Sequence, residues 1–137
     1  MKKDIPELKV EDLAIAIAPR DEKTPILKED LWDTYIINLK EEPIQNVMVV
    51  SKGYGIINGE QIKTTALRHF FEEIAPLDIL KIEPIMTKLF EITNEYWVSF
   101  SYGGQLYDKK YIFVVGSIEK INFTPIPFLN KRGVMIR

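Results

Sequence analysis

The sequence is most informative at residues 95–115, which read EYWVSFSYGGQLYDKKYIFVV. Two runs of alternating residues flank Gly103-Gly104, and glycine adopts the positive φ angles that a two-residue hairpin turn needs. Facing residues lie equally far from such a turn, so Phe100 should face Tyr107. The alternation predicts an antiparallel sheet with one face in the core and a more polar face in water. The predicted core face holds Tyr96, Val98, Phe100, Tyr102, Gln105, Tyr107, Lys109, Tyr111, Phe113 and Val115.

The composition also favours strands over helices. The 137 residues suffice for one domain, spanning 1–137. They include 20 Ile and 8 Val but only 5 Ala, and β-branched side chains fit a pleated sheet better than a helix. An all-α fold is therefore disfavoured. The 46% apolar and 28% charged residues are typical of a soluble globular domain.

Charge and cysteine content argue against several functions. Lys and Arg number 18 against 20 Asp and Glu, so the net charge of −2 gives no electrostatic reason to expect nucleic acid or an anionic membrane as a partner. The absence of cysteine excludes disulfides, thiolate metal sites and a cysteine nucleophile. The first apolar run, residues 13–18, is too short for a signal-peptide core or a membrane span. A cytoplasmic location is expected.

Further strands are predicted before the hairpin. Residues 13–18 alternate isoleucine or leucine with alanine up to Pro19, so one face is a core face and the alanine face lets a loop or a second subunit approach closely. The charged residues 20–30 predict an exposed loop. Strands are expected at 31–39 and, as an apolar run buried on both faces, at 46–51.

The middle of the chain contains a second hairpin signal. Asn58-Gly59 separates two strand-like runs, and the glycines at 53 and 55 are predicted to permit a bulge or twist before the turn. Residues 64–77 are ambiguous between a strand that continues to about Phe70 and a short helix near 65–75, and the preceding turn favours the strand. Residues 77–85 predict another strand. Seven or eight short strands together indicate an all-β, immunoglobulin-like antiparallel sandwich.

The C-terminal segment, residues 122–137, is too apolar for a solvated tail and too rich in proline for a central strand. We expect it to be ordered and to dock either on its own sandwich or on a second copy of the chain. The candidate interaction residues are its apolar side chains, Phe123, Ile126, Phe128, Leu129, Val134, Met135 and Ile136.

The sequence offers no catalytic motif. His69 is the single histidine and lacks a glycine-framed serine or a set of zinc ligands, so it is interpreted as a partly exposed strand residue. Glu72 and Glu73 with Asp78, or Glu91 with Glu95, are candidate acid–base pairs that 20 acidic residues would also produce by chance. No catalytic residue, cofactor site or metal site is therefore predicted.

Two further groups of side chains are interpreted as structural. Aromatic residues could stack sugars or bases if they were exposed together, but aromatic side chains in strands more often lie in the core. Four basic residues could form a small patch, which nearby acids would offset. The aromatic group is Trp32, Tyr54, Trp97 and Tyr102, and the basic group is Lys109, Lys110, Lys131 and Arg132.

Residues 32–39, 51–55 and 126–136 resemble a group of small, uncharacterised bacterial single-domain proteins. Members of this group sometimes carry the label of a phenylalanyl-tRNA synthetase alpha subunit. The residues do not support that label, because a class II synthetase core is far longer than 137 residues and no arginine-bearing ATP motif is present.

These observations favour a non-enzymatic protein-interaction or structural domain. Its expected working surfaces are the C-terminal segment and the alanine face of the first strand, and its expected partner is another protein or a second copy, as in a dimer. One alternative is a small-molecule or carbohydrate binding module. A second alternative is an RNA- or synthetase-associated accessory protein.

Overall fold

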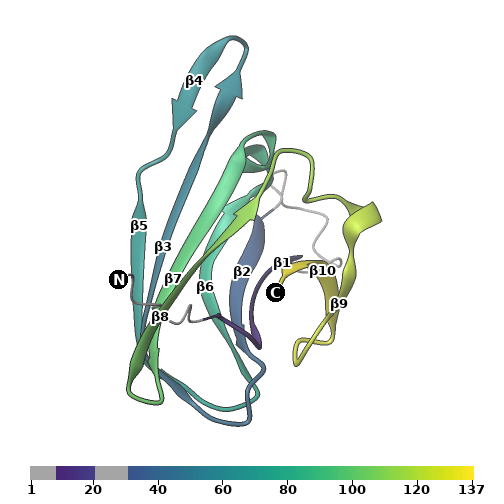
Figure 1. Cartoon of the computed structure of the whole chain (residues 1–137). Helices are drawn as coiled ribbons and strands as arrows, with labels where there is room; N and C mark the ends of the chain where they lie inside the picture. The colour runs from purple at the N-terminus through teal and green to yellow at the C-terminus, as the bar shows by residue number, and fades with distance from the viewer. Residues whose placement is uncertain (1–8, 21–30) are drawn as a thin grey trace, which may run out of the picture.

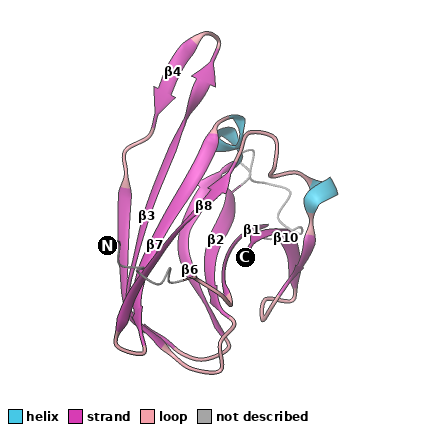
Figure 2. Ribbon diagram, viewed as in Figure 1, coloured by secondary structure: helices cyan, strands magenta, loops and turns pink. Residues whose placement is uncertain are grey.

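The computed structural model describes residues 9–20 and 31–137, and in this part the chain is mostly antiparallel β-structure in two sheets that face each other (Figures 1 and 2). The first sheet has the order β6-β2-β1-β10-β9, and the second has the order β4-β3-β7-β8, with β5 also paired to β3. The strands are β1 (Leu13–Pro19), β2 (Leu31–Asn38), β3 (Ile44–Ile57), β4 (Glu60–Lys63), β5 (Leu67–Ile74), β6 (Asp78–Met86), β7 (Thr93–Tyr102), β8 (Gln105–Phe113), β9 (Thr124–Ile126) and β10 (Lys131–Ile136). The all-β prediction is confirmed, although the described residues form ten strands rather than seven or eight.

The hairpin of β7 and β8 has the predicted register. Phe100 pairs with Tyr107, and Gly103 and Gly104 have φ angles of 57° and 76°. Five side chains of the predicted core face are buried: Tyr96, Val98, Phe100, Tyr111 and Phe113. The prediction is wrong for Gln105, which is exposed beside the turn, and for Val115, which is 56% exposed because β8 ends at Phe113 and the chain then turns at Gly116 with a φ of 83°.

β3 is the central strand of the second sheet. Val47 and Val49 are buried against the first sheet, whereas Met48 and Val50 point to the outer face and are only partly buried. The prediction that residues 46–51 are buried on both faces is therefore wrong. A two-layer sandwich covers only one side of each sheet, and an apolar run alone does not reveal how many layers surround it.

Within the ambiguous residues 64–77, residues 67–74 form the strand β5, so the alternative of a helix near 65–75 is wrong; the hairpin strand β4 itself ends at Lys63 rather than continuing to about Phe70. β5 pairs with β3 through contacts such as His69 opposite Val49, and this pairing outweighs the helical spacing of the apolar residues. β5 continues past Phe70 to Ile74. The Asn58-Gly59 turn is also confirmed, with φ angles of 51° and 79°, and its hairpin projects beyond the other strands at the top of Figure 1.

The two glycines of β3 serve close packing rather than the predicted bulge. A Cβ atom added at Gly53 or at Gly55 would lie 2.9 Å from a side-chain carbon of Ile92. Ile92 is itself buried, directly before β7. The irregularity in the pairing of β3 with β7 lies elsewhere, between Gln45 and Met48.

The two helices are short 3-10 turns, η1 (Thr87–Glu91) and η2 (Lys120–Asn122). Within 9–20 and 31–137, no helix has the length and apolar character required to cross a membrane. The predicted strands at 31–39 and 77–85 correspond to β2 and β6. The predicted loop at 20–30 lies, except for Arg20, outside the described residues.

Candidate functional site

The C-terminal segment docks on the chain's own first sheet. β10 pairs with β1, with Ile17 opposite Val134, and β9 forms the outer edge of the same sheet. Pro125 is therefore placed on an edge strand, where a missing N–H is tolerated. The ring of Phe123 lies 5.7 Å from that of Trp32, measured between centroids. Of the candidate interaction residues, Ile126 and Val134 are buried, Phe123, Leu129, Met135 and Ile136 are partly buried, and Phe128 is 51% exposed.

The alanine face of β1 is covered by this same segment. Ala14 and Ala16 are fully buried in a small cluster with Ile126, against which Leu129 and Met135 pack. Gly133 lets β10 lie close to β1, because a Cβ atom at this position would lie 2.9 Å from the Cβ of Ala18. The two surfaces expected to contact a partner thus contact each other within one molecule, and Figure 1 shows β9 and β10 curling beside β1.

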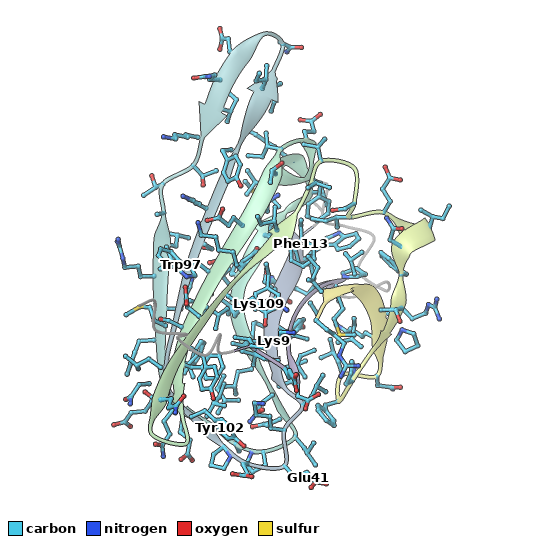
Figure 3. The ribbon with its side chains drawn as sticks, viewed as in Figure 1. Lys9, Glu41, Trp97, Tyr102, Lys109 and Phe113 are labelled. Atoms are coloured by element: carbon cyan, nitrogen blue, oxygen red, sulfur yellow. The ribbon has the colours of Figure 1, made fainter. Side chains whose placement is uncertain are left out.

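The exposed apolar side chains gather instead around the second sheet. Of the twelve exposed large hydrophobic residues in the described part of the chain, six belong to strands of this sheet, and Val114 and Val115 follow β8 directly. Trp97 on β7 is 43% exposed and lies on the face turned away from the core (Figure 3). The six residues in strands are Ile56, Leu67, Phe70, Trp97, Leu106 and Ile112.

β8 is an edge strand of the second sheet and carries two of these exposed apolar side chains. Among the described residues, β7 is the one strand that pairs with β8. Leu106 is 78% exposed and Ile112 is 41% exposed, and Asp108 and Lys110 lie between them on the same face. The indole nitrogen of Trp97 donates to Asp108 Oδ2 at 2.9 Å. A long edge strand with exposed apolar side chains is a site at which another strand can pair.

A polar cluster lies between the two sheets. The spacing of its residues in the sequence did not predict that they would come together. Oε1 of Glu83 accepts hydrogen bonds from Ser51 Oγ at 2.7 Å and from His69 Nε2 at 2.6 Å. Ser51 is on β3, His69 is on β5 and Glu83 is on β6, so the cluster connects the two sheets. His69 is partly exposed, as predicted. The hydroxyl group of Tyr96 hydrogen-bonds Thr34 nearby at 3.1 Å.

A second buried charge lies at Asp33 on β2. The guanidinium of Arg20 donates to both carboxylate oxygens, at 2.8 Å and 3.1 Å, and the ammonium of Lys81 lies 3.4 Å away. Burial alone would raise the pKa of Asp33, but the hydrogen bonds from Arg20 and the charge of Lys81 outweigh burial and hold this pKa below its usual value. Asp33 is therefore an ionised, structural carboxylate.

The candidate acid–base residues are distributed over several elements. Glu72 and Glu73 are neighbours on β5, where consecutive side chains point to opposite faces, and Glu73 accepts a hydrogen bond from Gln45. Asp78 accepts a hydrogen bond from the N–H of Ile79. Glu91 is exposed in η1, whereas Glu95 is buried on β7 and accepts a hydrogen bond from the Tyr54 hydroxyl group.

The aromatic and basic groups are not gathered into single patches either. Trp32 packs edge-on against Phe90 in the region of the first sheet, whereas Tyr54, Trp97 and Tyr102 belong to the second. Lys109 and Lys110 are consecutive on β8 and therefore lie on opposite faces. Lys131 and Arg132 belong to β10 in the first sheet.

Comparison with known proteins finds no matching family model, curated protein or solved structure. The function is therefore inferred from the geometry of the chain itself. Two features were not predicted from the sequence, the exposed edge at β8 and the cluster at Glu83. The alternation of Leu106, Asp108, Lys110 and Ile112 was a visible signal for the first, whereas the second required the pairing of the sheets.

Proposed function

We propose that the chain is a non-enzymatic protein-interaction domain that pairs with a second copy of itself through the free edge of β8. The observation that carries this proposal is the order of side chains along the strand. Antiparallel pairing about Lys109 would place Asp108 of each copy opposite Lys110 of the other, and Leu106 opposite Ile112. An edge strand rich in charge normally resists pairing, but this order makes β8 complementary to itself.

The backbone geometry of the hairpin supports the same register. A tight turn closes on a hydrogen-bonded pair, here Tyr102 and Gln105, so alternate residues from Leu106 onward direct their N–H and C=O groups away from β7. Asp108 and Lys110 are two of these residues, and they would form the hydrogen-bonded pairs between copies. The register also places Lys109 opposite its own counterpart on the inner face, a like-charge pair that costs stability, and each ammonium lies 5.0 Å above the Tyr111 ring of its own chain, which stabilises it there.

Charge exchange at β8 tests the proposal. The variant Asp108→Lys places Lys opposite Lys, and the variant Lys110→Asp places Asp opposite Asp. We expect the wild-type chain to sediment as a dimer, and each variant alone to dimerise at least about tenfold more weakly, since like-charge pairs are unfavourable. An equal mixture of the two variants places opposite charges at both positions and should restore a dimer.

The matched control is Glu91→Lys, which makes the same charge change as Asp108→Lys in the exposed η1. This control should sediment as the wild type does. A wild-type chain that remains monomeric at millimolar concentration would overturn the proposal. Two variants that each dimerise as strongly as the wild type would also overturn it, because the interface would then lie elsewhere.

We further infer an immunoglobulin-like topology from the strand order. The order β6-β2-β1 corresponds to strands E-B-A of such a sandwich, and β3-β7-β8 corresponds to C-F-G. β9 and β10 extend the first sheet beyond β1. In this topology β8 is the terminal strand of its sheet, which is consistent with its use as an interaction edge.

A further inference from the structure

A half-open cavity of about 120 Å³ lies beside the Glu83 cluster. Its wall is apolar at Ile85 and Leu89, and hydroxyl-bearing at Thr64 and Thr65, where the chain passes from β4 to β5. An apolar cavity of about 150 Å³ holds benzene, so this space fits a group of about five or six non-hydrogen atoms. The cavity is therefore large enough to hold a small ligand or the end of a side chain.

Glu83 is the acidic residue on the wall of the cavity. Within the described residues, both hydrogen bonds to its carboxylate end on Oε1 and none on Oε2. Ser51 donates to Oε1 without adding charge. The lysine of the wall, Lys52, has its ammonium 3.6 Å from Glu95. Within the described residues, His69 is the one basic side chain with a nitrogen within 4 Å of the Glu83 carboxylate.

We propose that this cavity binds a small primary alkylammonium ion. The ammonium group donates to Oε2 of Glu83, and the alkyl chain contacts Ile85 and Leu89. A charge-assisted hydrogen bond in a partly buried site is stronger than a neutral one, so the site prefers an ammonium to a hydroxyl group on the same alkyl chain. The hydrogen bonds from Ser51 and His69 hold the carboxylate in place and make it a preorganised acceptor.

Titration of the full chain with n-butylammonium chloride, followed by the amide signals of Ser51, Thr64 and Glu83 in NMR spectra, tests the proposal. We expect saturable shifts, with n-butanol binding about tenfold more weakly because it lacks the charge. Sodium chloride at equal ionic strength should not produce the shifts. Failure of butylammonium to give saturable shifts, or equal binding of butanol, would overturn the proposal.

Two variants separate the role of charge from that of folding. Glu83→Gln should lose the preference for butylammonium over butanol, and Glu72→Gln on the exposed part of β5 is its control. Thr65→Phe alters an exposed residue at the cavity wall and should block both probes without touching Glu83. Binding of butylammonium that survives Thr65→Phe would place the site elsewhere. None of these outcomes depends on the pairing of β8.

Discussion

Phe100 is the residue at which the core of the hairpin can be tested most directly. It is 2% exposed, and its ring stacks on that of Tyr107 with 5.3 Å between centroids. We expect Phe100→Ala to lower the free energy of unfolding by about 3–5 kcal/mol, through lost burial and the cavity left behind. Urea denaturation measures this loss. The control is Phe70→Ala at a 57% exposed ring, and equal losses in the two variants would contradict the core assignment.

The lowered pKa of Asp33 predicts how the free energy of unfolding changes as the pH falls. Its pKa in the folded chain lies below the value near 3.9 of an unfolded aspartate, so its charge stabilises the fold fully above about pH 4. This contribution is lost as the pH falls through the folded pKa. We expect the wild type to lose stability below about pH 4 and Asp33→Asn to be less stable at pH 7 with a weaker acid dependence. Urea denaturation from pH 7 to pH 2 measures both, with Glu91→Gln as the control.

At the scale of the element, β10 depends on its close approach to β1. A side chain at Gly133 has no room, because its Cβ would lie 2.9 Å from the Cβ of Ala18 and 3.0 Å from its Cα. We expect Gly133→Ala to destabilise the chain by about 1–3 kcal/mol, because backbone atoms must move apart. Gly104→Ala is a contrasting variant with open space but a φ of 76°. Hydrogen exchange should then be faster in β9 and β10 of Gly133→Ala only.

Deletion of residues 123–137 tests the same element more severely. Removal of β9 and β10 uncovers Ala14, Ala16 and Ile37, which are fully buried in the complete chain. We expect aggregation and a lower melting temperature, since a contiguous apolar patch is exposed. A truncated chain with unchanged solubility and melting temperature would show that the segment contributes nothing to the fold.

For the whole molecule, two tyrosine hydroxyl groups connect the sheets. Tyr111 donates to the carbonyl oxygen of Leu13 at 2.8 Å, and Tyr96 hydrogen-bonds Thr34 at 3.1 Å. Burial raises the pKa of both tyrosines well above the usual value near 10. Their contribution to stability is therefore complete below about pH 10 and declines as the pH rises further, because the unfolded chain ionises first.

We accordingly expect the free energy of unfolding to fall above about pH 10. Tyr111→Phe should cost about 1 kcal/mol at neutral pH, through the lost hydrogen bond, and should weaken the alkaline decline. Denaturation in urea between pH 8 and pH 11 checks both effects. Tyr107→Phe, at a partly exposed ring on the same strand, is the control. An alkaline decline of equal steepness in Tyr111→Phe would contradict the assigned role.

The local structure could be predicted from the amino-acid sequence alone. The alternation of residues 95–115 predicted the strands, the register and most of the buried rings, because side chains on a strand have a period of two. Gly103-Gly104 and Asn58-Gly59 predicted their turns, because few other residues adopt positive φ at both positions. The alternation of residues 13–18 also predicted that something would approach the alanine face closely.

Which residues of the two sheets contact each other could not be predicted without the tertiary structure. The alanine face is covered by the chain's own Ile126 and Met135, and Met48 and Val50 face outward because only one sheet covers β3. Ser51, His69 and Glu83 come together on three strands that are separated in the sequence. Contacts of this kind depend on how two sheets stack and on which residues of one sheet lie opposite the other. The local pattern of a strand specifies which of its faces is apolar, but it does not specify which other residues cover that face. Burial depends on the summed packing of the whole chain.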